Sequence, residues 1–251
     1  MSLIPASFDL NLLKVKRFFF SKTIRVSKPN QKMKTIPLHP SPLKLKIDLE
    51  HMPYGVYRKV LVPGNINMLQ LHFIIQVAMG WEFAHLFQFQ DKRDKPSFAA
   101  VIPFEEDDYM YEQYYDALPV DEVMLKESFE LSRDRKPFWY WYDFGDSWWH
   151  KLTFQKPTKK DLQAYKGAPV CLEAFGACPP EDVGGPWGYA EFLDIISNKK
   201  HPEHREMREW AGLPPRKEYD HESVDQKSVN KALEGLYHSS DWSLTVADYF
   251  Q

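Results

Sequence analysis

The sequence has little cysteine, and this excludes several classes of protein. Only two cysteines, Cys171 and Cys178, occur in 251 residues. Two thiols cannot form the disulfide framework of a small secreted domain, so we expect the reducing cytoplasm as the compartment. They cannot supply the ligands of a zinc-finger module either, and their separation does not match a standard zinc spacing. Both are predicted to be small buried thiols.

Long apolar runs and glycine motifs are missing as well. No run of about 18 apolar residues occurs, which predicts that this chain does not cross a membrane. The N-terminal stretch also lacks the basic-then-apolar order of a signal peptide. The chain has 11 glycines, and none of them forms the spaced pattern of a P-loop or of a dinucleotide-binding turn. Nucleotide binding through either of these motifs is therefore excluded.

Charge is unevenly distributed along the chain. The formal net charge is -3, but residues 1–46 hold ten lysines or arginines against a single acid, Asp9. A basic arm on an acidic body is typical of a segment that contacts nucleic acid, while a solvated leader is the simpler interpretation. Residues 1–41 are therefore predicted to be a basic, poorly packed leader, and residues 42–251 a single domain. The stretch before Met33 either packs poorly or belongs to an over-extended reading frame.

Apolar periodicity predicts strands first and helices last. Strict alternation predicts a strand over 43–50, followed by a second strand over 56–62. Asn67 can cap a helix over 68–79 that ends at Gly80, and this helix is apolar on nearly all sides, so it should be buried. The remaining predicted elements are a strand over 85–90, a helix over 121–131, a hairpin of strands 138–144 and 148–154, a brief helix after Thr158, and helices beginning at Pro186, Pro202 and Ser223.

This order of elements predicts an α+β fold. In that fold, β-hairpins form a sheet packed against the buried helix, and the C-terminal part is mainly helical. The sequence contains no internal repeat and no long low-complexity linker that would divide the predicted domain.

Carboxylates are concentrated at two predicted turns. Asp143 and Asp146 lie at the hairpin tip, while Glu181 and Asp182 lie in the segment CPPEDVGGPWGY. If the turns meet, these four oxygen ligands suit Mg²⁺ or Mn²⁺, and His150 would be the general base in the hydrolysis of a phosphoester. The simpler interpretation is that the hairpin aspartates bind turn amides and that Asp182 caps the following helix.

The other histidines have simpler explanations. His72 and Gln76 lie one turn apart on the apolar helix, and we expect a hydrogen-bonded core pair because buried polar groups need partners. His85 lies between that helix and the next strand, where it can meet either His72 or the hairpin. A three-histidine site of His72, His85 and His150 is an alternative that no local spacing supports.

Half of the eight tryptophans fall within the predicted hairpin. Alternation places Trp139 and Trp141 on one face of the first strand, together with Asp143. If that face is exposed, it is an aromatic surface for a protein, a sugar or single-stranded nucleic acid; if it is covered, it is core. The neighbouring acids argue against nucleic acid. The residues predicted to bind a partner are Trp139, Trp141, Trp149 and Trp187.

Four sequence blocks carry a resemblance to a known family. The blocks are LHFIIQVAMGWEFAHLFQF, YDFGDSWWH, CPPEDVGGPWGYAEFL and HPEHREMREWAG. In this order, from about Leu43 to about Leu236, they resemble the plasmid pRiA4b ORF-3-like family, some members of which are labelled transposon-passenger proteins resembling TnpR. The resemblance implies a single α+β domain, an association with mobile genetic elements and no known biochemical activity or catalytic residue. The chain departs from the family where Tyr57 replaces a tryptophan before the basic pair Arg58-Lys59.

The leading functional prediction is a cytoplasmic, non-enzymatic binding or accessory module without a resident cofactor. Its partner would be a protein in a mobile-element context, held by the aromatic hairpin and the PPEDVGG loop. The alternative is a divalent-metal-dependent hydrolase acting on phosphoesters. A third interpretation, nucleic-acid binding through the basic leader, predicts a steep salt dependence.

Overall fold

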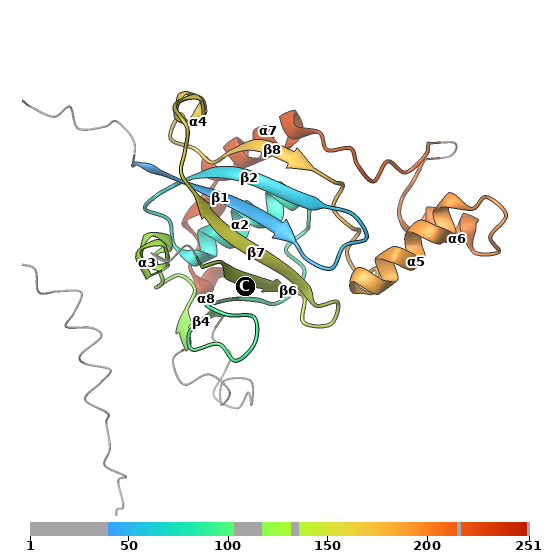
Figure 1. Ribbon diagram of the computed structural model, residues 1–251, viewed down its shortest axis with the longest axis horizontal. Helices are drawn as coiled ribbons and strands as arrows, with labels where there is room; N and C mark the ends of the chain where they lie inside the picture. Colours follow the sequence, from blue (N-terminus) through green and yellow to red (C-terminus); the bar gives the residue numbers. More distant parts are fainter. Residues whose placement is uncertain (1–39, 103–116, 132–135, 215–216, 250–251) are drawn as a thin grey trace, which may run out of the picture. The chain divides into compact units, whose positions relative to one another are not determined.

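The computed structural model describes residues 40–102, 117–131, 136–214 and 217–249 (Figure 1). All of them belong to one compact unit, Pro37–Gln251. The predicted basic leader lies almost entirely outside the described residues. Within the described ranges, no helix is long and apolar enough to cross a membrane.

The centre of the fold is one mixed sheet of eight strands (Figure 1). The strands are β1 (Pro42–Leu49), β2 (Val56–Pro63), β3 (Phe87–Gln90), β4 (Ala99–Val101), β5 (Ala117–Pro119), β6 (Phe138–Tyr142), β7 (Trp148–Gln155) and β8 (Val170–Phe175). Their order is β5-β4-β3-β6-β7-β1-β2-β8, and neighbours are antiparallel except β4 and β5. The predicted α+β class is confirmed.

The helices of the described ranges make up most of the C-terminal part, and some of them cover one face of the sheet. They are α2 (Met68–Met79), α3 (Leu125–Leu131), α4 (Lys159–Ala164), α5 (Gly185–Ser197), α6 (His204–Trp210), α7 (Gln226–Tyr237) and α8 (Val246–Tyr249), with a 3₁₀ turn η2 (Ser240–Ser243). In Figure 1, α2 and α7 lie behind the sheet, and α7 contacts both α2 and β8. The mainly helical C-terminal part is confirmed.

Helix α2 has the predicted bounds because both of its ends are encoded locally. The Asn67 side chain accepts a hydrogen bond from the Gln70 amide, and the Gln70 side chain accepts one from the Asn67 amide. Gly80 ends the helix in the left-handed conformation, with φ of 96°. The predicted polar pair on this helix is partnered through a third residue: His72 and Gln76 each bond to the Tyr140 hydroxyl, at 2.7 and 3.0 Å.

Other predicted boundaries differ from the structure. Helix α7 begins at Gln226 rather than near Ser223, because the Asp225 side chain accepts hydrogen bonds from two amides of its first turn. Helix α3 begins at Leu125, later than predicted. The edge strand β8 was not predicted, since its residues do not alternate clearly between buried and exposed positions.

The β6–β7 hairpin separates the core from the outer face of the sheet. Its inward side chains are Phe138, Tyr140, Tyr142, Trp148, His150 and Leu152, all of them buried. His150 therefore points into the core, as alternation predicted. Trp139, Trp141 and Trp149 point outward and are half-buried. In Figure 1, no helix of the described part of the chain lies over this outer face.

Candidate functional site

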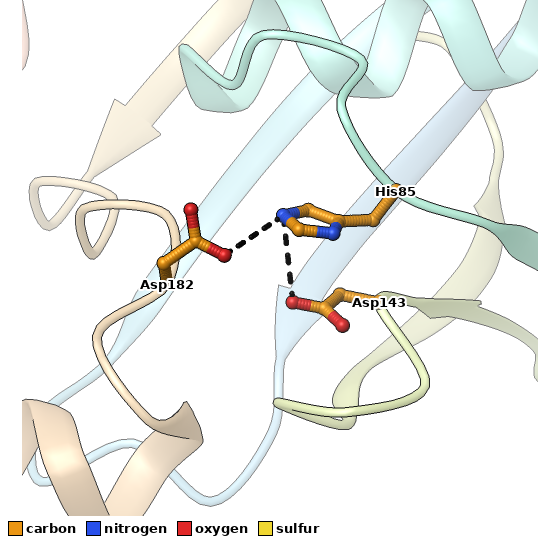
Figure 2. Close-up of side chains that lie close together, drawn as sticks. All are labelled: His85, Asp143 and Asp182. Atoms are coloured by element: carbon orange, nitrogen blue, oxygen red, sulfur yellow. Dashed lines mark ion pairs between the residues drawn. The ribbon is translucent and has the colours of Figure 1, made fainter.

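Three side chains from separate segments converge beside the hairpin tip (Figure 2). His85 comes from the loop between α2 and β3, Asp143 follows β6, and Asp182 lies in the loop before α5. His85 Nε2 lies 3.2 Å from Asp182 Oδ1 and 3.7 Å from Asp143 Oδ2. One potential ligand atom from each residue lies within 4.8 Å of the other two. We call these three residues the His-Asp-Asp cluster.

The spacing of the cluster suits a shared cation. Ligand atoms about 2.1 Å from a tetrahedral metal ion lie about 3.4 Å from one another, so both distances from His85 Nε2 fit, whereas the cluster as a whole extends to 4.8 Å and would have to contract around an ion. His85 Nε2 is shielded from solvent, and its contact with Asp182 lacks the geometry of a hydrogen bond. The Asp182 side chain is 70% exposed, so the cluster is open to solvent on that side.

Asp143 serves both the turn and the cluster. Its Oδ1 accepts hydrogen bonds from the amides of Gly145 and Asp146, at 2.9 and 3.3 Å, while its Oδ2 faces His85. The prediction that Asp143 shares the outer face with the tryptophans is wrong, because β6 ends at Tyr142. Asp143 adopts the left-handed conformation, with φ of 52°, and its side chain turns inward and is buried.

Asp182 also has a left-handed backbone, with φ of 58°. Its carboxylate points toward His85 (Figure 2). The N-cap of α5 is Gly184, and no side chain caps this end of the helix. The interpretation of Asp182 as a helix cap is therefore wrong. Two cluster residues with backbones that are costly for non-glycine residues indicate a local structure built around these side chains.

The other two predicted carboxylates hold the neighbouring loops together. Glu181 Oε1 accepts hydrogen bonds from the Tyr142 hydroxyl at 2.7 Å and from the Glu82 amide at 3.1 Å. Asp146 Oδ2 accepts one from the Gly184 amide at 3.0 Å. These bonds connect the hairpin tip and the His85 loop to the segment before α5. Glu181 and Asp146 therefore position the cluster, and both already have donors.

His150 lies away from the cluster, in the core. It is 0% exposed, and neither ring nitrogen forms a hydrogen bond of normal geometry. Burial lowers its pKa to about 3, against the opposing effect of the main chain of Tyr140 and Trp148. This position does not suit the predicted role of general base. The imidazole at the cluster belongs to His85, which the sequence suggested only as part of a three-histidine site with His72 and His150.

Two clefts adjoin the cluster. Asp182 lines one of about 340 Å³ together with Glu191, Glu203, Glu206 and Trp210. His85 lines another of about 660 Å³, whose walls are mainly apolar. The first cleft is acidic, so polyanions would be repelled from the exposed side of the cluster.

A close backbone contact at Gly185 gives a first prediction. A Cβ at Gly185 would lie 2.3 Å from the Asp146 carbonyl oxygen, and Gly185 has φ of 68°. Gly185→Ala is therefore expected to lower the free energy of unfolding by at least about 2 kcal/mol in urea denaturation. The matched control is Gly235→Ala in α7, where a Cβ would meet nothing within 4 Å. This exchange is expected to stabilise by about 0.5–1 kcal/mol. Equal effects of the two exchanges would contradict the contact.

The fold and the cluster together define an α+β protein with a candidate metal centre. The chain belongs to the family described as plasmid pRiA4b ORF-3-like protein, whose model matches residues 41–228 and so includes the whole cluster. It is 36% identical over 198 residues to the uncharacterized protein y4hQ of Sinorhizobium fredii (strain NBRC 101917 / NGR234), covering 78% of this chain and 92% of that protein.

One solved structure is similar over most of its length. It is the crystal structure of MM3350, a protein of unknown function from Methanosarcina mazei Go1. The TM-score is 0.59 and the sequence identity 30%, covering 74% of this chain and 96% of that chain. These names assign no activity, so the functional argument rests on the cluster.

Proposed function

We propose that this protein is a divalent-metal-dependent hydrolase whose ion is held by His85, Asp143 and Asp182. The convergence of three potential ligand atoms within 4.8 Å carries this proposal. The nearby hydrogen bonds support it, because Glu181 and Asp146 fix the loops that present the ligands. The left-handed backbones of Asp143 and Asp182 support it as well.

The ligand set favours Zn²⁺ or Mn²⁺ over Mg²⁺. Imidazole suits zinc and carboxylates suit manganese, whereas the Mg²⁺ or Mn²⁺ expected from the sequence rested on four oxygen ligands. Three protein ligands leave coordination positions for water and substrate, which distinguishes catalytic from structural zinc sites. The exposure of Asp182 gives a substrate access to these positions.

The surroundings restrict the substrate. The acidic cleft beside Asp182 disfavours a long polyanion such as nucleic acid. A small phosphoester, whose charge the ion would neutralise, fits the proposal better, and the apolar cleft beside His85 can receive its uncharged part.

Metal-dependent stabilisation tests the proposal. With an ion at about 100 times its dissociation constant, the folded state should gain about 2.7 kcal/mol. For a domain of this size, the melting midpoint should rise by roughly 5–10 °C in Zn²⁺ or Mn²⁺ relative to EDTA. Asp182→Asn and His85→Ala should abolish most of this rise, because each removes one ligand. Hydrolysis of p-nitrophenyl phosphate, measured with the same proteins, tests the catalytic part.

The control is Glu191→Gln, which removes the same charge from the same cleft but leaves the cluster intact. It should keep the metal-induced rise. An equal rise in wild type and Asp182→Asn, or no rise with either ion, would refute the metal centre. A rise without hydrolysis of any small ester would limit the protein to metal binding.

A second candidate, the binding module expected from the sequence, is favoured by the outer face of the hairpin. Trp141 and Trp149 stack with ring centroids 4.8 Å apart, and both donate to the Ser147 hydroxyl. The Arg93 guanidinium lies 5.2 Å from the centre of the Trp149 ring, and Trp187 on α5 is 89% exposed. Rigid aromatic side chains of this kind are frequent at protein interfaces.

This candidate is tested separately from the metal centre. Capture of a protein partner by wild type, lost in Trp141→Ala, would support it. The association with mobile genetic elements that the resemblance implied stays a prediction.

A further inference from the structure

A separate cleft of about 920 Å³ lies between α5, α6, the β1–β2 turn and residues 217–221. It has none of the cluster residues in its walls. Its volume falls within the range of small-molecule sites, about 300–1,000 Å³. Its lining combines apolar side chains with cationic ones, so the cleft offers two chemically distinct kinds of surface.

The apolar side is formed by α5 and by a pair of rings in tilted contact. Leu193 and Ile196 line it from α5. The Tyr54 hydroxyl bonds to the hydroxyl of buried Tyr189, so that Tyr54 contributes its ring rather than its hydroxyl to the cleft. The His221 ring lies 4.4 Å from the Tyr54 ring. This wall suits a flat or aliphatic body.

The polar side is formed by two residues one turn apart on α6. Arg208 Nη2 donates to the carbonyl oxygens of Pro214 and Lys217, at 2.8 and 2.6 Å, which holds the guanidinium in place. Its Nε and Nη1 donors have no partner among the described residues. His204 Nδ1 donates to the Ile195 carbonyl oxygen at 3.1 Å, which leaves Nε2 as its second polar group.

The local charge is unusual for this chain. Residues 47–251 carry 22 basic and 34 acidic residues. The cleft nevertheless has Lys199, Arg208 and Lys217 in its walls against two acids, and one of these acids, Glu218, lies 3.7 Å from Lys199. A fixed guanidinium with free donors in such a wall favours an anion.

We infer that this cleft binds a small organic anion, with its carboxylate or phosphate on Arg208 and its apolar body against Tyr54 and Leu193. The inference is independent of the metal centre, because the two sites share no residue. It adds a ligand site to the part of the chain formed by α5 and α6.

Calorimetric titration with phenyl phosphate tests this inference. Wild type should bind phenyl phosphate saturably, and Arg208→Met should weaken binding at least tenfold. The matched control is Arg205→Met on the same helix, whose side chain is 90% exposed and pairs with Glu209. It should bind as tightly as wild type. Equal affinities of the two variants, or no saturable binding by wild type, would overturn the inference.

If Arg208→Met fails to fold, titration of wild type with the two halves of phenyl phosphate still tests the inference. Inorganic phosphate and phenol should each bind wild type at least tenfold more weakly than phenyl phosphate, because each uses one wall of the cleft. Inorganic phosphate that binds as tightly as phenyl phosphate would refute the apolar part of the site. Benzoate in place of phenyl phosphate distinguishes a carboxylate ligand from a phosphate ligand.

Discussion

Replacing Arg58 by methionine is expected to lower the free energy of unfolding by about 3–5 kcal/mol. Arg58 is 1% exposed, and its partners are all carbonyl oxygens. Nε donates to Ala78 at 2.7 Å, in the last turn of α2, where carbonyls lack helical partners. Nη1 lies 2.8–3.0 Å from the carbonyl oxygens of Tyr57, Phe175 and Gly176. Without the guanidinium, these carbonyl oxygens lose this buried hydrogen-bond donor.

The neighbouring residue supplies the control. Lys59 lies on the outer face, where it pairs with Glu173 at 2.8 Å and is partly exposed. Lys59→Met should change stability by no more than about 1 kcal/mol, as surface ion pairs contribute little. Arg58→Lys should restore little, because an ammonium cannot reach both the helix end and the end of β8 as the guanidinium does. Urea denaturation compares the variants, and similar effects at positions 58 and 59 would refute this account.

Local signals in the sequence were sufficient to predict where α2 begins and ends and which side chains of the β6–β7 hairpin face the core. Asn67 and Gly80 act on amides and carbonyls within one turn, so a short window contains both partners of each bond. The alternation of Tyr140 and Trp141 between faces is likewise a property of adjacent residues. The four sequence blocks that resemble the pRiA4b ORF-3-like family indicated the family, and the match of the family model to residues 41–228 confirms it.

The cluster could be predicted only in part, because its residues are far apart in the chain. The sequence identified Asp143 and Asp182 as candidate ligands but grouped them with Asp146 and Glu181, since all four lie at turns. Which oxygens remain available is decided by donors such as the Gly184 amide and the Tyr142 hydroxyl, and these contacts depend on tertiary packing. The left-handed backbone that turns Asp143 inward is also not visible in an alternation pattern.

Acidification is expected to destabilise this protein at pH values that are still well above those at which its carboxylates take up protons. His72 and His150 are both 0% exposed. Burial lowers the pKa of His72 well below 6.5, and burial together with the nearby charge of Arg58 lowers that of His150 to about 3. The unfolded chain binds a proton at each site near pH 6.5, while the folded chain does not. The stability that these groups contribute is therefore complete above about pH 6.5 and is lost as the pH falls toward 3.

The size of the loss follows from the proton balance. Below its unfolded-state pKa, a histidine that stays neutral in the fold costs up to about 1.4 kcal/mol per pH unit, so His150 alone should remove about 1.7 kcal/mol between pH 6.5 and 5.0, and His72 adds to this loss. Urea denaturation at intervals of half a pH unit measures this slope. The carboxylates with a lowered pKa, such as Asp91, Asp161 and Glu173, add their own losses mainly below about pH 4.5.

His150→Leu separates the two histidines. Because neither ring nitrogen of His150 makes a hydrogen bond of normal geometry, leucine removes a buried polar group without leaving a partner unsatisfied. The variant should match or exceed wild-type stability at pH 8, and its stability should fall less steeply between pH 6.5 and 5.0 than that of wild type. An unchanged slope would mean that His150 takes up a proton inside the folded core. A large loss at pH 8 would mean that its ring is held by a polar contact, and the core would then need a different account of why it keeps an imidazole beside Arg58.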